Sequence, residues 1–316
     1  MIKKIVLGLL LILFFTFLYK ASSYIEPFAG KINNYASAFF SLGIDVKDLI
    51  KKYTSSSNNL TSNTAVTKIK ILIVPGHEPD FGGAEYKNLK ERDLNLALAE
   101  KLKILLTQNP KFEVIMTRDT NGWNPVIKNY VDGNKKEIQA WVTSKKKEMD
   151  RLIDNGQVTE VKAEMGHANA STNSATLLYG VNKWAAENKV DIALHLHFND
   201  NPKYQGKPNY AGFSIYVPEK QYVNSVPSKI LAKDLMAELS KIQKVSTMKA
   251  ESAGVIEDQE LIAIGSHNII DSLSILTEYA YIYEDFLQSA PSRNLFLDQA
   301  AASTAKAINN FFDSRV

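Results

Sequence analysis

The pattern of apolar and polar positions predicts strands that alternate with helices along most of the chain. Short apolar runs rich in β-branched residues predict strands at 68–75, 112–117, 190–197, 211–217 and within 271–283. Apolar residues at helical spacing predict helices at 92–106, 175–188, 228–242 and 292–312. This alternation favours an α/β fold with a mainly parallel central sheet that helices cover on both faces.

The N-terminus has the pattern of an export signal. Lys3 and Lys4 precede an apolar run over residues 5–19, and Lys20 follows it. Positive charge before such a run is typical of a signal peptide or a signal anchor. We expect residues 1–23 to form a hydrophobic anchor helix, slightly favoured over a cleaved signal peptide. The remainder would face the extracytoplasmic space, either tethered to the membrane or secreted after cleavage.

A membrane-proximal segment and a linker are expected at residues 24–67. From residue 54 to residue 64, every residue except Leu60 is Ser, Thr or Asn. Such a stretch buries almost no apolar surface and is typical of a flexible tether. We therefore place a domain boundary there and expect one folded domain over residues 68–316.

Residues 121–166 fit the alternation less well, because they are polar and mixed in charge. An apolar stripe that includes Ile138, Val142 and Leu152 predicts one long helix in this segment. The segment would act as a lid, as a docking surface for a regulatory protein, or as a solvated helical insertion. The last of these is the interpretation we favour.

Composition and charge narrow the chemistry. The 316 residues include 37 basic and 34 acidic side chains, for a net charge of +3, which does not indicate a nucleic-acid partner. Cysteine is absent, which excludes disulfides, thiolate metal sites and a cysteine nucleophile. Any metal would therefore be bound by oxygen and nitrogen ligands.

Two of the five histidines stand at the ends of predicted strands. His77 follows the first strand through a Pro-Gly turn, and His197 ends the strand at 190–197. The carboxyl ends of parallel strands meet at one edge of a sheet, so these side chains can converge. Either histidine alone would be interpreted as a hydrogen-bonded loop residue. Their equivalent positions favour a metal site.

Two glutamates complete the candidate chemistry. Glu91 begins the helix after the His77 loop, where an acid also suits the helix dipole. Glu278 lies in the apolar run SILTEYAYIY, where an unpaired buried carboxylate would be costly. Two histidines, one carboxylate and a water form a typical catalytic zinc site. A second carboxylate beside it can take a proton from the water and pass it to a leaving amine.

Several motifs, taken in order, resemble a known family. They are ILIVPGH at 71–77, GGA at 82–84, ERDLNLA at 91–97, VIMTR at 114–118, VDIALHLHFN at 190–199, GFSIY at 212–216 and ILTEY at 275–279. Their order is similar to that of the zinc-dependent N-acetylmuramoyl-L-alanine amidases of the amidase type 3 family. The resemblance spans residues 68–312.

The resemblance implies zinc ligands at His77, Glu91 and His197, with Glu278 as the catalytic residue. It also implies hydrolysis of the amide that joins N-acetylmuramic acid to L-alanine in peptidoglycan. His195 lies two residues before His197, on the same strand face. We expect His195 to support the ligand from behind or, in a shifted register, to replace it.

Two other functions stay open at this point. A zinc amide hydrolase of a small N-acyl amino acid would keep the metal and change the substrate. A non-catalytic peptidoglycan-binding module would keep only the scaffold. The four candidate side chains favour an enzyme, because a binding module has no use for a base. The expected partners are therefore peptidoglycan, the membrane through the N-terminal segment, and a regulatory protein.

Overall fold

A six-stranded sheet forms the centre of the domain in the computed structural model, which describes residues 68–163, 170–200, 210–222, 224–264 and 272–313. In sheet order the strands are β4 (Phe112–Met116), β1 (Ile69–Pro75), β7 (Ile192–Asn199), β10 (Leu273–Tyr281), β8 (Ser214–Pro218) and β9 (Val255–Asp258). All pairs are parallel except β10 with β8. The prediction of a mainly parallel sheet is confirmed.

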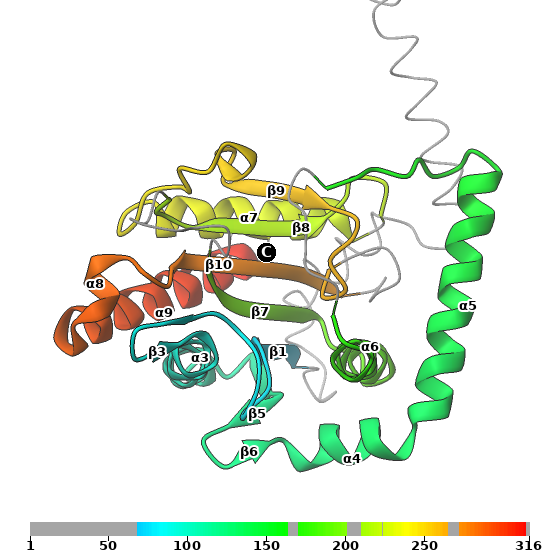
Figure 1. Cartoon of the computed structure of the whole chain (residues 1–316), viewed down its shortest axis with the longest axis horizontal. Coiled ribbons are helices and arrows are strands. Elements are labelled where there is room, and N and C mark those ends of the chain that lie inside the picture. The colour runs from blue at the N-terminus through cyan, green and yellow to red at the C-terminus, as the bar shows by residue number, and fades with distance from the viewer. Residues whose placement is uncertain (1–67, 164–169, 201–209, 223, 265–271, 314–316) are drawn as a thin grey trace, which may run out of the picture. The chain divides into compact units, whose positions relative to one another are not determined.

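Helices cover both faces of this sheet (Figure 1). Helices on one face are α3 (Glu91–Thr107), α7 (Ser225–Leu239) and α9 (Ala290–Asp313). Helices on the other face are α4 (Pro125–Gly133), α5 (Lys135–Asp154) and α6 (Thr172–Glu187). Smaller elements are the hairpin strands β2 (Glu85–Tyr86), β3 (Leu89–Lys90), β5 (Arg118–Asp119) and β6 (Gly122–Trp123), the turn η1 (Lys249–Glu251) and the helix α8 (Asp285–Gln288).

The central strands are apolar on both faces because helices bury both. Ile71, Leu72 and Ile73 are all fully buried, although successive side chains point to opposite faces. Leu72 packs with Trp184 of α6, whereas α3 packs against β1, β4 and β7 from the other side. The register sets Pro75 of β1 opposite Leu196 of β7, so both strands end at one edge of the sheet.

The segment expected to form one long helix forms two, so that prediction is wrong. Asn124 caps α4, accepting hydrogen bonds from the backbone at Val126 and Ile127, and Pro125 is its first residue. The helix ends at Gly133, which is a weak helix former. Asn134 then separates α4 from α5, and its side chain donates to the carbonyl of Tyr130.

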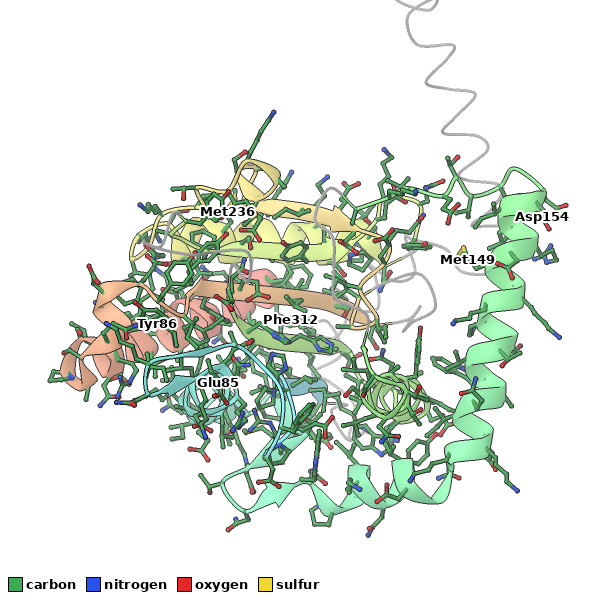
Figure 2. All side chains as sticks on the ribbon, in the orientation of Figure 1. Glu85, Tyr86, Met149, Asp154, Met236 and Phe312 are labelled. Atoms are coloured by element: carbon green, nitrogen blue, oxygen red, sulfur yellow. The ribbon has the colours of Figure 1, made fainter. Side chains whose placement is uncertain are left out.

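Helix α5 reaches beyond the sheet and is fixed at its far end by a small apolar cluster. Met149 is on the side of α5 that faces the rest of the domain, and Asp154 ends the helix (Figure 2). Met149 packs with Leu152 and Val158. The insertion is therefore a packed part of the domain.

The anchor expected at residues 1–23 and the linker expected at 24–67 lie outside the described residues, and both stay predictions. Within the described part of the chain, no helix has the length and apolar character needed to cross a bilayer.

Candidate metal centre

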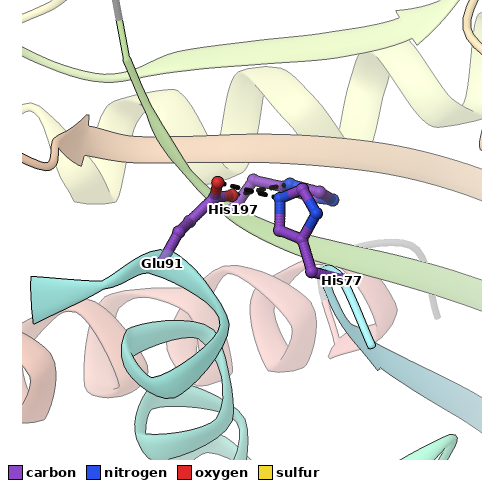
Figure 3. A group of neighbouring side chains, drawn as sticks. All are labelled: His77, Glu91 and His197. Carbon is purple, nitrogen blue, oxygen red and sulfur yellow. Dashed lines mark hydrogen bonds and ion pairs between the residues drawn. The ribbon is translucent and has the colours of Figure 1, made fainter. Parts of the chain in front are cut away.

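Three side chains from separate elements converge at the edge where β1 and β7 end. His77 follows β1, Glu91 is the first residue of α3, and His197 lies near the end of β7. Figure 3 shows the Glu91 carboxylate pointing toward the two imidazoles. The backbone amide of Gly76 donates to the carbonyl of Leu196, which ties the His77 loop to the strand that carries His197.

The three side chains are in direct contact. The Glu91 Oε2 atom lies 2.8 Å from Nε2 of His77, and its Oε1 atom lies 2.9 Å from Nδ1 of His197. The ring centroids are 5.1 Å apart, with the ring planes at 75°. One nitrogen or oxygen atom from each residue lies within 4.8 Å of the other two. These three side chains could together hold a metal ion.

The donor atoms also suit a small divalent ion. Tetrahedral zinc, with bonds of about 2.0–2.2 Å to nitrogen and oxygen, places its ligand atoms about 3.3 Å apart. The two carboxylate–imidazole separations above are close to this spacing. His77, Glu91 and His197 fit such an ion.

The protonation states favour metal binding as well. Glu91 is 5 % exposed, and burial alone would raise its pKa, but hydrogen bonds and charge interactions with His197 and His77 lower the pKa far below its usual range. Burial lowers the pKa of His197, an effect that Glu91 partly opposes. An ionised carboxylate and a neutral imidazole are the forms that bind metal.

Backbone donors hold the Glu91 carboxylate in place. Oε2 accepts from the amide of Ala84 at 2.9 Å, and Oε1 accepts from the amide of Phe198 at 3.2 Å. The side-chain amide of Asn95 donates to Oε1 of Glu91 and to the carbonyl of Gly76. Groups behind a ligand fix its orientation, so this side chain is held in advance of any ion.

Two glycines allow the backbone to approach the imidazoles closely. A Cβ atom on Gly76 would lie 2.3 Å from Cε1 of His197. A Cβ atom on Gly83, whose φ is +86°, would lie 2.8 Å from Cδ2 of His77. Neither distance is sterically allowed, so the shape of the site requires glycine at both positions.

Arg118 braces the loop that carries His77. Its guanidinium, 2 % exposed, donates to the carbonyls of His77 at 3.0 Å, Gly76 at 2.9 Å and Arg92 at 2.8 Å. Burial lowers the pKa of Arg118 to about 10, with Asp93 favouring and Arg92 opposing the charged form, so the group is charged at neutral pH. His77 has φ +66°, a left-handed conformation that costs a non-glycine residue about 1–2 kcal/mol. The guanidinium therefore restrains a strained residue.

We expect Arg118→Lys to weaken divalent metal binding about 10–100-fold, as is typical when a group that orients ligands is changed. An ammonium group cannot present a planar fork to several carbonyls at once. The measurement is the zinc dissociation constant by chelator competition, alongside thermal unfolding of the metal-free protein. Arg293→Lys is the matched control, because Arg293 donates to a carbonyl remote from the His77 loop, that of Leu287. Reduced stability with unchanged metal affinity would give Arg118 a purely structural role.

Glu278 lies beside the three converging side chains. It pairs with His197 across β10 and β7, so the two side chains share a face of the sheet. Within the described residues, its Oε2 atom is buried and has no hydrogen-bond partner. Burial raises the pKa of Glu278 well above its usual value, and the charges of Glu91 and Glu251 raise it further. Such a carboxyl group is suited to carrying a proton.

His195 does not join the group of converging donors. It is 2 % exposed, and its Nε2 atom has no hydrogen-bond partner within the described residues. Burial, followed by the charge of His197, lowers its pKa to about 3. The neutral ring therefore packs in the sheet interior on the same face as His197, while His197 itself contacts Glu91.

Comparison with known protein families identifies the family to which the chain belongs. The family model described as N-acetylmuramoyl-L-alanine amidase matches residues 71–310. The chain belongs to this family, as its ordered motifs predict. Its reaction is hydrolysis of the amide between N-acetylmuramic acid and L-alanine in peptidoglycan, as the motifs predict. No match was found among curated protein sequences.

One solved structure shares the fold at a TM-score of 0.50, and two others are less similar. The CwlD amidase of Clostridioides difficile, determined in complex with the GerS lipoprotein, matches 78% of this chain and 100% of its own at 16% identity and a TM-score of 0.50. Ami1 of Mycobacterium smegmatis matches 79% and 100% at 12% identity, with a TM-score of 0.49. The catalytic domain of CwlV from Bacillus (Paenibacillus) polymyxa matches 77% and 98% at 17% identity, with a TM-score of 0.47. Identities this low bear on the fold alone.

Sequence reasoning missed several residues that shape the site. Arg118 and Asn95 lie within motifs of the resemblance, but neither was assigned a role. Gly76 was treated only as part of a turn. A buried charge directly after a strand was the one available signal for Arg118, because a cation there requires acceptors.

Proposed function

We propose that the chain is a zinc amidase in which His77, Glu91 and His197 bind the ion and Glu278 is the general base. The observation that supports this proposal is the convergence of two imidazoles on one carboxylate, with a second carboxyl group paired beside His197. Family membership supplies the substrate, peptidoglycan.

Glu278 would move the proton in this reaction. A bound zinc ion would polarise the amide carbonyl and lower the pKa of a water molecule to near neutrality. The Glu278 carboxylate would accept a proton from the attacking water and deliver it to the nitrogen of the departing L-alanine. Because the environment raises the pKa of Glu278, the carboxyl group would hold the proton until it passes to the departing nitrogen.

Glu91 and the two histidines would have a fixed role. Contacts with Ala84, Phe198 and Asn95 orient the carboxylate, and none of these partners needs to move during the reaction. His195, packed behind His197, would support that ligand from the interior of the sheet. Preorganised groups of this kind avoid a cost of rearrangement at the transition state.

Metal content tests the proposal directly. We expect the purified protein to hold about one zinc ion per chain and to lose its amidase activity on dialysis against a chelator. Added zinc should restore the activity, because donors held by the fold do not depend on the ion for their placement. Elemental analysis and release of stem peptides from purified cell wall are the two measurements. Full activity in a protein shown to be free of metal would contradict the proposal.

We propose further that the enzyme acts outside the cytoplasm, tethered through residues 1–23. The basic and apolar pattern at the N-terminus supports export, and a cell-wall substrate requires it. A regulatory protein is also an expected partner. A fractionation experiment would separate a membrane-bound chain from a secreted one.

A further inference from the structure

A pocket with charged and apolar side chains in its lining includes Glu78 of the loop after His77 and is built largely by the insertion. Its volume is about 480 Å³, which falls within the range of ligand pockets. Helices α4, α5 and α6 line it, together with Trp123 of β6 and Glu78. The residue that follows a candidate metal ligand is therefore part of the wall of this second pocket.

A hydrogen bond ties the loop that follows His77 to the helix that lines the pocket. The Ser174 hydroxyl group, in the first turn of α6, donates to Oε1 of Glu78 at 3.1 Å. This bond holds the loop after His77 against the helix that forms one side of the pocket. Because Glu78 directly follows His77, the wall of the pocket begins one residue away from a candidate metal ligand.

The charge of the lining is positive overall. The lining contains three lysines, Lys128, Lys135 and Lys136, and two acids, Asp132 and Glu78. Asp132 lies against both Lys128 and Lys135 in the same wall. Trp123, half-buried, adds an apolar surface beside these charges. The lining suits a ligand that combines aliphatic groups with a carboxylate.

The two arms of the substrate differ in charge. The arm on the acyl side is a sugar whose lactyl carboxyl group is consumed in the amide bond. The arm on the amine side is a peptide that ends in a carboxylate. We propose that the pocket is a subsite for the peptide arm, in which Lys135 and Lys136 attract its carboxylate. This inference rests on the proposed function, and it gives the insertion a role in substrate binding.

A charge-reversal cycle tests the subsite. The probes are N-acetylmuramoyl-L-alanyl tripeptides with uncharged side chains, one ending in a carboxylate and the other in an amide. We expect the wild type to prefer the carboxylate by about tenfold in kcat/KM, mainly through KM, since each exposed charge pair contributes modestly. Lys135→Glu with Lys136→Glu should abolish or reverse that preference and leave the amide substrate within about twofold. The preference should also shrink in high salt.

The matched control is Lys146→Glu with Lys147→Glu. Both residues are exposed on α5 and lie outside the pocket lining, so this variant makes the same change of net charge. It should keep the wild-type preference. If both double variants lower the preference equally, or if neither does, the subsite is wrong. Lys135→Gln with Lys136→Gln repeats the test with a smaller change, should the reversal impair folding.

Binding separates failure of the subsite from failure of the proposed function. Calorimetry measures the affinity for the free L-alanyl tripeptide carboxylate without requiring catalysis. Binding that is lost in the pocket variant and kept in the control would support the subsite even in a protein that hydrolyses neither probe. Hydrolysis of both probes without a carboxylate preference would overturn the subsite and leave the amidase intact.

Discussion

Glu278→Gln is expected to reduce hydrolysis of the peptidoglycan amide by about 10²–10⁴-fold while the protein still binds its metal. Glutamine keeps the shape of the side chain but cannot accept and return a proton. The residue pairs with His197 in the sheet and lies outside the three-residue cluster that offers ligand atoms, so metal affinity should be preserved. The measurements are the rate of stem-peptide release and the zinc content of the same sample.

Glu257→Gln is the matched control for this variant. Glu257 lies on β9, at the edge of the same sheet, and forms an ion pair with Lys229. It contributes nothing to the metal centre, so its loss should leave the rate within about twofold. A Glu278→Gln protein that releases stem peptides at the wild-type rate would remove Glu278 from the mechanism.

Gly76→Ala is expected to weaken metal binding strongly. The new methyl group would meet the ring of His197, so the ring would have to move away from the position in which it contacts Glu91. Overpacking of this kind typically costs about 1–3 kcal/mol of stability. We expect metal affinity to fall by at least about 100-fold, because the displaced ring carries a ligand atom. Zinc titration and thermal unfolding measure the two effects.

Gly133→Ala provides the comparison. A Cβ atom at Gly133, the last residue of α4, would meet no atom within 4 Å. Alanine also favours the helix, so this variant should be as stable as the wild type or slightly more stable. Normal metal affinity in Gly76→Ala would mean that His197 relaxes easily and that the close approach has no functional role.

Much of the sheet, and of the helices that cover it, could be predicted from the local pattern of apolar and polar residues. The runs that form β1, β7 and β10 are apolar because both faces of these strands are covered, and these strands and β4 lie within a few residues of their expected ranges. The convergence of His77 and His197 follows from the rule that parallel strands end at a common edge. The position of Glu91 followed from its place at the start of the next helix.

Other features depend on contacts that are distant in sequence and leave little local signal. The helix breaks at Asn134 because its side chain donates a hydrogen bond to a backbone carbonyl at the end of α4. A pattern of apolar residues cannot indicate such a hydrogen bond. The role of Arg118 depends on carbonyl groups about 41 to 43 positions earlier in the chain. The parallel strand β9 pairs only at the sheet edge, and its run over Val255–Asp258 is too short and polar to stand out.

The pairing of Glu278 with His197 affects how the substrate range of such an enzyme could change during evolution. Neighbouring strands are held about 4.8 Å apart by their backbone hydrogen bonds, independently of side-chain identity. The backbone of the sheet therefore sets the distance between the Glu278 carboxyl group and the His197 imidazole. The surface around these two groups is formed by loops and by the added helices α4 and α5. Changes in that surface could alter which wall fragments are admitted without disturbing the spacing of the reactive groups.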